Sequence, residues 1–236
     1  MQVSRGVAIA VQYVLDEVIP PRLRDSKLLM YPLMRLILKA QAREFMSFKD
    51  YFFRASPQQI ADLYARVEEV GSLQGESDLN KRSVQRIMEL ISGRDVLEVG
   101  CGRGYLAGVM ATKHPVTASD IVLADGVAER YPDVSFVVSD IENLHFADNA
   151  FETVVCTHTL EHTKNLHRAI SELRRVGSKE LIVVVPRQRP YKYTFSLHSH
   201  FFPYRWSLES AFGGRDSAQI ERHGDWLYYE RLDQER

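Results

Sequence analysis

Hydrophobic residues are spaced differently in the two parts of the chain, and the spacing changes near residue 93. Before that point apolar residues recur every three or four positions, which is the period of a helix with one buried face. After it, short apolar runs alternate with helical segments, as in strands connected by helices within a mostly parallel sheet. The pattern therefore predicts a helical N-terminal region followed by an α/β domain.

The best-marked helix of the N-terminal region begins near residue 57. Ser56 is an N-cap residue, Pro57 suits the first helical position, and Gln59 can return a hydrogen bond to the cap. These signals predict a helix that runs to about Val70.

Three further helices are expected on weaker signals. Residues 3–18 and 26–54 have helical apolar spacing, and we expect Pro32 to break or bend the second. Asp78 can cap another helix that ends at Ile91.

From residue 94 the predicted elements alternate, and we list them in chain order: strand 94–99, helix 104–113, strand 115–120, helix 123–130, strand 134–139, strand 151–157, helix 163–176 and strand 180–185. Two extended runs, 217–222 and 226–231, follow and are joined by a hairpin signal at His223-Gly224-Asp225. We expect an α/β protein with a Rossmann-like, doubly wound, mostly parallel sheet that ends in an antiparallel hairpin. The expected domains are an N-terminal helical cap over residues 1–77 and the α/β domain over 78–236.

Composition narrows the class of protein. With 45% hydrophobic and 26% charged residues, the 236-residue chain has the composition of a soluble globular protein. Its net charge of -1 argues against a nucleic-acid partner. Cys101 and Cys156 lie in predicted core elements, which suits a reducing compartment, and we expect a cytoplasmic protein. The apolar stretch 6–19 is too short and too interrupted by polar residues to span a bilayer or to act as a secretory signal.

Candidate chemistry gathers at the carboxyl ends of successive predicted strands. The first strand runs through Glu98 into a turn with three glycines, Gly100, Gly102 and Gly104. Asp120 closes the second strand, about 20 residues later, where a carboxylate can accept both hydroxyls of a ribose. Ligands of open α/β sheets bind at this edge, so these groups should converge on one ligand.

In these segments the sequence resembles the class I S-adenosylmethionine-dependent methyltransferases. The matching pieces are VLEVGCGRG, the acid of ASDI, SDIENLHFADNAFETVVCTHTLEH and HRAISELRRV, within residues 78–230. The resemblance implies S-adenosylmethionine as cofactor and assigns its parts to residues of this chain. By this resemblance, the methionine part would contact Glu98, Gly100, Cys101, Gly102 and Gly104. The ribose would contact Asp120 and Ile121, the adenine would contact Asp140 and Ile141, and the sulfonium end would face His158. The acidic Glu98, just before the glycines, also suits a ligand with an ammonium group better than a pyrophosphate.

Three other classes of protein compete with this interpretation. Counted from Gly102, the turn satisfies G-x-G-x-x-A, the fingerprint of a nicotinamide-dependent oxidoreductase. His158 and His162 match the H-x-x-E-H pattern of zinc hydrolases, but the strand before His158 predicts that the two histidines straddle a strand-to-helix turn, so we expect no metal there. A non-catalytic binding module could also keep the fold.

The segment 186–206 is expected to bind the acceptor of the methyl group. It carries four arginine and lysine residues, no acidic residue and six aromatic rings before Trp206, which suits a small and anionic acceptor such as a sugar, a lipid or another metabolite. His200 is the first candidate for a general base toward an oxygen or nitrogen nucleophile, and His158 is the second. The basic, apolar segment 22–54 is expected to form a helical lid, and peripheral membrane contact is an alternative role for it. The acceptor and the oligomeric state stay open.

Overall fold

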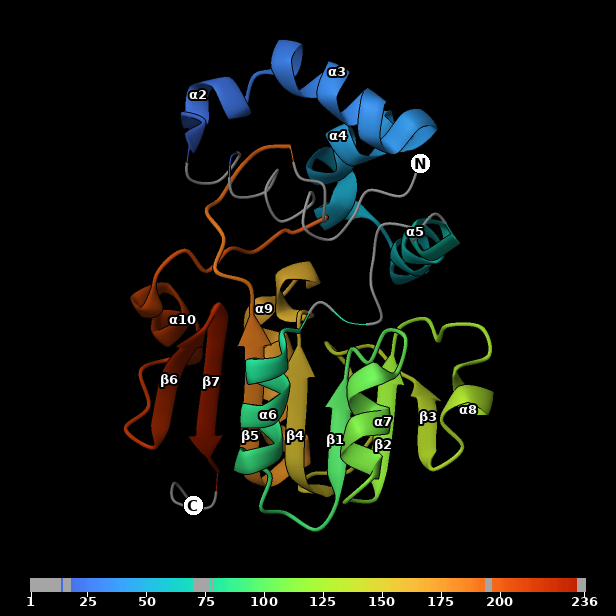
Figure 1. Cartoon of the computed structure of the whole chain (residues 1–236), viewed down its shortest axis with the longest axis vertical. Coiled ribbons are helices and arrows are strands. Elements are labelled where there is room, and N and C mark those ends of the chain that lie inside the picture. The colour runs from blue at the N-terminus through green and yellow to red at the C-terminus, as the bar shows by residue number, and fades with distance from the viewer. Residues whose placement is uncertain (1–13, 15–17, 70–76, 78, 194–196, 233–236) are drawn as a thin grey trace. The chain divides into compact units, whose positions relative to one another are not determined.

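The computed structural model describes residues 14, 18–69, 77, 79–193 and 197–232 of the chain (Figure 1). The chain divides into two compact units. Unit 1 comprises Met1–Gly75 and Gln188–Phe201, and unit 2 comprises Glu76–Arg187 and Phe202–Arg236. The boundary after Gly75 lies close to the predicted one after residue 77, whereas the segment Gln188–Phe201, which we placed in the second domain, belongs to unit 1.

Unit 1 is helical in its described part. Its elements are α2 (Pro21–Arg24), α3 (Lys27–Leu38), the 3-10 helix η2 (Lys39–Gln41), α4 (Ala42–Tyr51), the 3-10 helix η3 (Phe52–Arg54) and α5 (Pro57–Glu69). Of the two predicted effects of Pro32, a break does not occur, because Pro32 lies inside α3. The interruption falls at Lys39, whose φ of 50° cannot continue a right-handed helix. The predicted helix over 3–18 lies outside the described residues, apart from Val14 and Val18.

The start of α5 confirms the predicted capping box. The Gln59 amide N–H donates to Ser56 Oγ over 3.2 Å, and the Ser56 amide N–H donates to Gln59 Oε1 over 2.8 Å. The next helix, α6 (Lys81–Leu90), begins later than we predicted. Its N-cap is Asn80, whose Oδ1 accepts a hydrogen bond from the Ser83 amide, and Asp78 lies outside the described residues.

The described part of unit 2 contains one sheet of seven strands in the order β3-β2-β1-β4-β5-β7-β6. Among β1 to β5, each pair of adjacent strands is parallel. The pairs β5·β7 and β6·β7 are antiparallel. Their bounds are β1 Val96–Val99, β2 Val116–Asp120, β3 Val134–Val138, β4 Phe151–Thr157, β5 Gly177–Val185, β6 Ala218–His223 and β7 Asp225–Arg231. The α/β architecture and the C-terminal hairpin are therefore confirmed.

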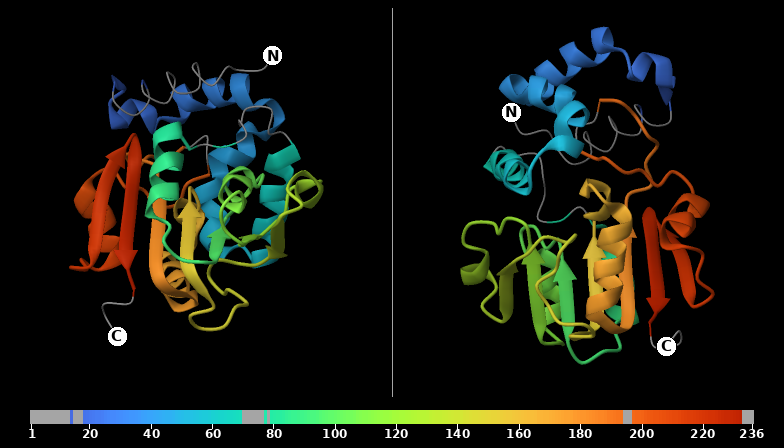
Figure 2. Two further views of the ribbon diagram at one scale, coloured as in Figure 1. Left: turned by 60° about the horizontal axis from the view of Figure 1, so that its bottom comes forward. Right: turned by 180° about the vertical axis from the view of Figure 1, so that it is seen from behind.

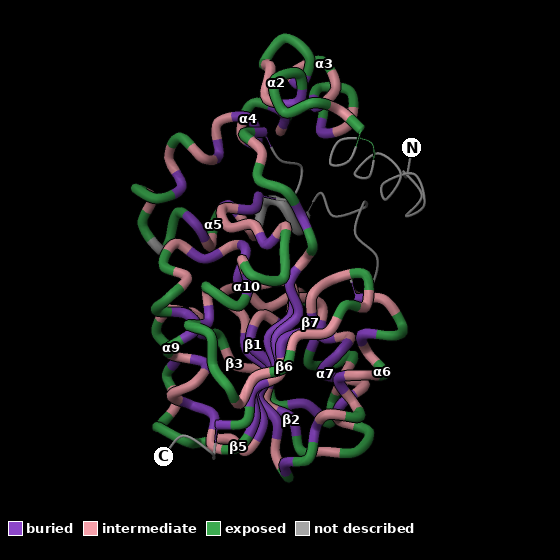
Figure 3. The backbone as a smooth tube through the Cα atoms, turned by 90° about the vertical axis from the view of Figure 1, so that its left-hand side faces the viewer, coloured by how far each residue is buried: buried purple, intermediate pink, exposed green. Residues whose placement is uncertain are grey.

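Helices cover both faces of this sheet. Between the strands lie α7 (Tyr105–Ala111), α8 (Val127–Arg130), the 3-10 helix η4 (Leu160–His162), α9 (Leu166–Val176) and α10 (Arg205–Phe212). Figures 1 and 2 show α6 and α7 on one face and α9 on the other. Consecutive residues of β1 belong to the cores on opposite faces of the sheet. Val96 belongs to the same core cluster as Ile87 of α6 and Met110 of α7, whereas Leu97 belongs to the cluster of Leu173 of α9. The purple band of buried strands between the two helical layers is visible in Figure 3. This core fixes the carboxyl ends of β1 to β5, where the candidate site lies.

Candidate functional site

The turn after β1 is built from glycines in the left-handed region. The amides of Gly100 and Cys101 both donate to the Ser119 carbonyl, over 2.7 and 3.0 Å, and so attach the turn to β2. At Gly100, with φ of 79°, a Cβ would lie 1.9 Å from Thr159 Oγ1, so the position has no room for a side chain. At Gly102, with φ of 49°, a Cβ would meet no atom within 4 Å. Gly100 is therefore required for packing, whereas Gly102 borders open space in which a ligand can approach the backbone.

Glu98 projects from β1 beneath this turn. Its side chain is only 2% exposed, and its Oε2 atom is buried without a hydrogen-bond partner. Burial raises the pKa of Glu98 well above its ordinary value, the nearby Asp120 carboxylate adds to the rise, and a hydrogen bond from the Ala107 amide opposes it. A buried carboxyl oxygen without a partner costs free energy unless a donor or a cation reaches it. Glu98 is therefore prepared to receive a cationic group.

Asp120 lies at the carboxyl end of β2 and supports the glycine turn. Its Oδ2 accepts a hydrogen bond from the Gly102 amide over 2.8 Å, and its Oδ1 accepts one from the Ile121 amide over 2.7 Å. Burial raises the pKa of Asp120, and these backbone bonds and the nearby His162 oppose the rise. The carboxylate thus links the end of β2 to the glycine turn.

Asp140 begins the loop between β3 and β4. Its Oδ1 accepts a hydrogen bond from the Glu142 amide over 2.8 Å, and its carbonyl accepts one from the Asn143 amide over 2.9 Å. Ile141 is partly buried against the core on the α9 side of the sheet. The loop therefore turns sharply after β3 and holds Asp140 and Ile141 at the carboxyl edge.

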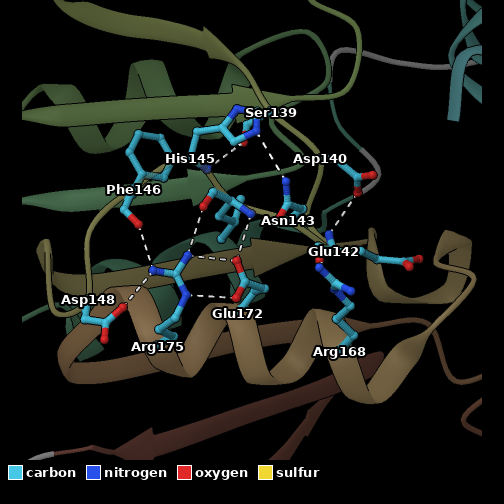
Figure 4. A network of polar contacts seen from close by, with 11 residues as sticks. Ser139, Asp140, Glu142, Asn143, His145, Phe146, Asp148, Arg168, Glu172 and Arg175 are labelled. Atoms are coloured by element: carbon cyan, nitrogen blue, oxygen red, sulfur yellow. Dashed lines mark hydrogen bonds and ion pairs between the residues drawn. The ribbon is translucent and has the colours of Figure 1, made fainter.

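Helix α9 fastens this loop through charged side chains, as Figure 4 shows. Arg175 donates to the Phe146 carbonyl over 2.7 Å and to the Leu144 carbonyl over 2.9 Å. Glu172 pairs with Arg175 at 2.8 Å and accepts the Leu144 amide over 2.8 Å. The hydrogen bond from Arg175 lowers the pKa of Glu172, so the pair stays charged near neutral pH. The helix that the sequence matched as HRAISELRRV thus determines the conformation of the loop that carries Asp140 and Ile141.

His158 directly follows β4 and lies between two carboxylates. Its φ is 50°, and its amide donates to the Val184 carbonyl over 2.9 Å. Its Nδ1 lies 3.5 Å from Glu161 Oε1, and its Nε2 lies 3.5 Å from Asp225 Oδ2. Burial lowers the pKa of His158, but the carboxylates of Asp225 and Glu161 together raise it to about 10. His158 is therefore an imidazolium cation at neutral pH.

The position of His158 also bears on the zinc pattern. His158 stands one residue beyond β4, whereas His162 ends the 3-10 helix η4. The two histidines thus straddle a strand-to-helix turn, as predicted, and do not share one turn of a helix. The H-x-x-E-H spacing here has a different conformation from the zinc-hydrolase pattern, which needs both histidines on one helix.

Sequence analysis missed the role of Asp225. We had treated this residue only as part of the hairpin turn, and no local signal connects it to His158. The contact arises because β7 runs antiparallel to β5 with Val185 opposite Trp226, which brings the start of β7 to the carboxyl ends of the parallel strands. Sequence analysis also missed the role of Glu161, which is fully buried in η4. Its contact with His158 depends on the conformation of the turn after β4.

The segment Gln188–Phe201 forms its own network within unit 1. The Nδ1 atom of the buried His198 lies 2.5 Å from Gln188 Oε1, and Gln188 Nε2 donates to the Tyr191 hydroxyl over 2.6 Å. The His200 ring meets the Phe53 ring edge-on at 6.5 Å. This segment is therefore a folded part of unit 1, and it is where the candidate base His200 is found.

Two cations of unit 1 hold the same segment. The Arg24 guanidinium lies 4.9 Å from the centre of the Tyr191 ring and donates to the Pro190 carbonyl over 2.7 Å. Lys49 donates to the Tyr191 carbonyl, and its Nζ lies 4.3 Å from the centre of the Phe201 ring. Burial lowers the pKa of Lys49 to about 8, Asp25 opposes this effect, and Arg24 adds to it.

The sheet defines a Rossmann-like α/β fold, and the glycine turn lies at the carboxyl edge where open sheets of this kind bind their ligands. Residues 97–185 match a family model described as a methyltransferase domain. Unit 2 is therefore similar to the class I S-adenosylmethionine-dependent methyltransferases, whose cofactor is S-adenosylmethionine. The competing nicotinamide fingerprint at Gly102 therefore does not decide the family.

Relatives of known sequence and structure agree with this family. A probable S-adenosylmethionine-dependent methyltransferase of Mycobacterium tuberculosis is 32% identical over 44% of this chain and 40% of its own length. A ubiquinone/menaquinone biosynthesis C-methyltransferase of Campylobacter jejuni is 22% identical over 54% of this chain and 59% of its own. The chain thus spans about half the length of these curated relatives.

Among solved structures, the Burkholderia thailandensis 1,6-didemethyltoxoflavin-N1-methyltransferase, with 1,6-didemethyltoxoflavin and S-adenosylhomocysteine bound, has the same fold. Its TM-score is 0.55 at 16% identity, and the match covers 75% of this chain and 90% of that one. No described helix of our chain is long and apolar enough to cross a membrane.

Proposed function

We propose that this protein transfers the methyl group of S-adenosylmethionine to an oxygen or nitrogen atom of a small, anionic acceptor. The observation that carries the cofactor part is the buried Oε2 of Glu98, without a hydrogen-bond partner, next to the open side of Gly102. The ammonium group of the cofactor would supply the missing partner, and the glycine turn leaves room for its methionine part. The residues present therefore fit the group. When bound, S-adenosylmethionine supplies a methyl group activated by its sulfonium.

The remaining cofactor contacts follow the order of the strands. Asp120 and Ile121 would hold the ribose, and Asp140 and Ile141 would hold the adenine. Asp120 already accepts the Gly102 amide through Oδ2, so a ribose hydroxyl would share this carboxylate with the turn. His158 would lie toward the sulfonium end, where its positive charge is balanced by Glu161 and Asp225.

His158 and His200 have different proposed roles. A base must be unprotonated before it can accept a proton, and a pKa of about 10 keeps His158 protonated at neutral pH. His158 therefore fits an electrostatic and positioning role. We assign the removal of a proton from the acceptor to His200, because histidine is the side chain that most often acts as a general base.

The nature of the acceptor rests on the segment 186–206. It carries Arg187, Arg189, Lys192 and Arg205 without an acidic residue, which favours a carboxylate or phosphate on the acceptor. The alternatives are a nicotinamide-dependent oxidoreductase and a binding module that keeps the fold without turnover.

A screen with methyl-labelled S-adenosylmethionine tests this proposal. Candidate acceptors are incubated in matched pairs, each with and without an anionic group, and label in the product is measured. We expect transfer to the anionic member of at least one pair, and a loss of about 10²-fold or more in rate for His200→Ala with little change in cofactor affinity. Parental turnover by the variant would show that His200 only packs against Phe53. Preference for uncharged acceptors would contradict the anionic assignment alone.

A further inference from the structure

Helix α3 carries apolar side chains on two opposite faces. Met30, Met34 and Leu38 follow one another at intervals of four residues and are buried within unit 1. On the other side, Leu28 is 89% exposed, Leu36 is 78% exposed and Leu29 is 44% exposed. A helix that is apolar all round belongs inside a protein or a membrane, because a helix on a protein surface normally exposes polar residues. The exposed apolar face of α3 is therefore a candidate surface for binding a partner.

The exposed leucines form one continuous stripe. At 100° per residue, Leu28, Pro32 and Leu36 lie within a quarter of the helix circumference, and Leu29 adjoins Leu36. The nearby helix α2 adds Leu23, which is 55% exposed. Twelve residues of helix are only about 18 Å long, much shorter than the roughly 30 Å hydrocarbon core of a bilayer. Such a helix can lie on a membrane but cannot cross it.

The segment that carries this stripe has an excess of positive charge. Between residues 21 and 40 the chain has five arginine or lysine residues and one acidic residue, Asp25. Of these basic residues, Arg22, Lys27, Arg35 and Lys39 are exposed, whereas Arg24 turns inward and donates to the Pro190 carbonyl. Basic residues beside an apolar stripe are the composition of helices that rest in the headgroup layer of anionic membranes.

We propose that the stripe Leu28, Leu29, Pro32 and Leu36 of α3, with its basic neighbours, docks unit 1 onto the surface of an anionic lipid bilayer. The excess of positive charge favours this partner over a second copy of the chain, because a second copy would bring the same positive charges. Four side chains also cover much less than the roughly 800 Å² that each partner buries in a stable protein interface. This proposal goes beyond methyl transfer and does not depend on it.

Co-sedimentation of the full chain with vesicles tests the proposal. We compare vesicles of phosphatidylcholine with vesicles that also contain phosphatidylglycerol, at low and at high salt. The protein should bind the anionic vesicles, should bind phosphatidylcholine much more weakly, and should dissociate as salt is added. Absence of binding to the anionic vesicles at low salt would overturn the proposal.

Two double variants separate the apolar and the electrostatic contributions. L28Q/L36Q removes the two most exposed leucines, and we expect its partition coefficient to fall by about tenfold or more. K27Q/R35Q should bind about 25-fold more weakly, since each basic residue near the surface contributes about fivefold. The matched control is Val138→Gln, which removes a 59% exposed apolar residue in unit 2 and should bind like the parent.

Circular dichroism and S-adenosylmethionine binding establish that each variant remains folded. Folded L28Q/L36Q that sediments with vesicles like the parent would overturn the assignment of the α3 stripe. Concentration-dependent dimers that disappear in L28Q/L36Q, together with no effect of that variant on vesicle binding, would identify a second copy as the partner instead. Failure of methyl transfer would leave the vesicle result unaffected, so the two proposals can fail separately.

Discussion

The Nε2 atom of His158 lies 3.5 Å from the Oδ2 atom of Asp225, although the two residues are far apart in the sequence. His158 directly follows the central parallel strand β4, and Asp225 begins the antiparallel strand β7. The C-terminal hairpin thus supplies a charge to the carboxyl edge of the parallel sheet. Together with Glu161, this charge raises the pKa of His158 to about 10.

Asp225→Asn should lower the pKa of His158 by about one unit or more, since a carboxylate this close shifts a pKa by roughly one to three units. A raised histidine pKa stabilises the fold fully below the unfolded value of 6.5, and this stabilisation is lost as the pH rises through about 10. The variant should lose that stability at lower pH than the parent. NMR titration of the imidazole measures the pKa, and Asp216→Asn, an exposed carboxylate before β6, is the control. An unchanged pKa would show that Glu161 alone holds the proton.

Substitution of two glycines in the same turn should have opposite consequences. Gly100→Ala should destabilise the fold severely, because its Cβ would lie 1.9 Å from Thr159 Oγ1. Gly102→Ala meets no atom within 4 Å, so its cost in stability should be limited to about 1 kcal/mol of left-handed backbone strain. Gly102→Ala should nevertheless weaken cofactor binding, and Gly102→Val should weaken it more. Thermal unfolding and calorimetric titration measure the two effects. Tight binding by folded Gly102→Val would show that the open space does not receive the ligand.

Asp120 offers a test that separates turn support from cofactor binding. Asp120→Ala should weaken S-adenosylmethionine binding by about 2–3 kcal/mol, because a charge-assisted contact to the ribose is lost. Asp120→Asn keeps an oxygen that can accept the Gly102 amide, so it should retain more of the stability of the turn. Titration and thermal unfolding of both variants give the comparison. Parental affinity in folded Asp120→Ala would leave this residue with the structural role alone.

Arg175 should influence cofactor affinity from outside the site. Arg175→Met removes the hydrogen bonds to the Leu144 and Phe146 carbonyls, each contributing about 1.5–3 kcal/mol to the fixed shape of the loop. The dissociation constant for S-adenosylmethionine should rise about tenfold, whereas kcat at saturating cofactor should change little. Arg94→Met, which removes an exposed guanidinium paired with Glu152, is the matched control. Equal affinity in the Arg175 and Arg94 variants would contradict the positioning role.

Local signals were sufficient for most of the fold. Alternation of apolar runs and helical segments predicted the strands β1–β5 of a mostly parallel sheet, and His223-Gly224-Asp225 predicted the hairpin. We missed α10 (Arg205–Phe212), because Tyr204 is an unusual residue before a helix and the cap hydrogen bonds come from Ser207. Pro32 does not break α3, although a proline inside a helix is a common sign of a break.

Part of the candidate site could likewise be predicted from the sequence, and part could not. Glu98 lies near the end of β1, Asp120 ends β2 and Asp140 comes shortly after β3, so their place at the carboxyl edge could be predicted from sequence. The pairing of His158 with Asp225 could not, because it depends on the register between β5 and β7. The attachment of the loop between β3 and β4 by Arg175 could not be predicted either, since the contacts go to backbone carbonyls and no residue pattern marks them.

Glu98 tests the central claim most directly. Burial raises the pKa of the Glu98 carboxyl group. In the ligand-free protein this group therefore reduces the stability of the fold as the pH rises above the ordinary pKa of a glutamate. Glu98→Gln removes that cost and keeps the shape of the side chain, but it removes the charge that would receive the ammonium group of the cofactor. The ligand-free variant should therefore unfold at the same or a higher temperature than the parent.

Calorimetric titration of the parent and of Glu98→Gln with S-adenosylmethionine and with NAD is the decisive measurement. We expect the parent to bind S-adenosylmethionine at micromolar concentrations and more tightly than NAD, and the variant to bind it about tenfold or more weakly. Tighter binding of NAD by the parent, or equal affinity for S-adenosylmethionine in parent and folded variant, would contradict the account.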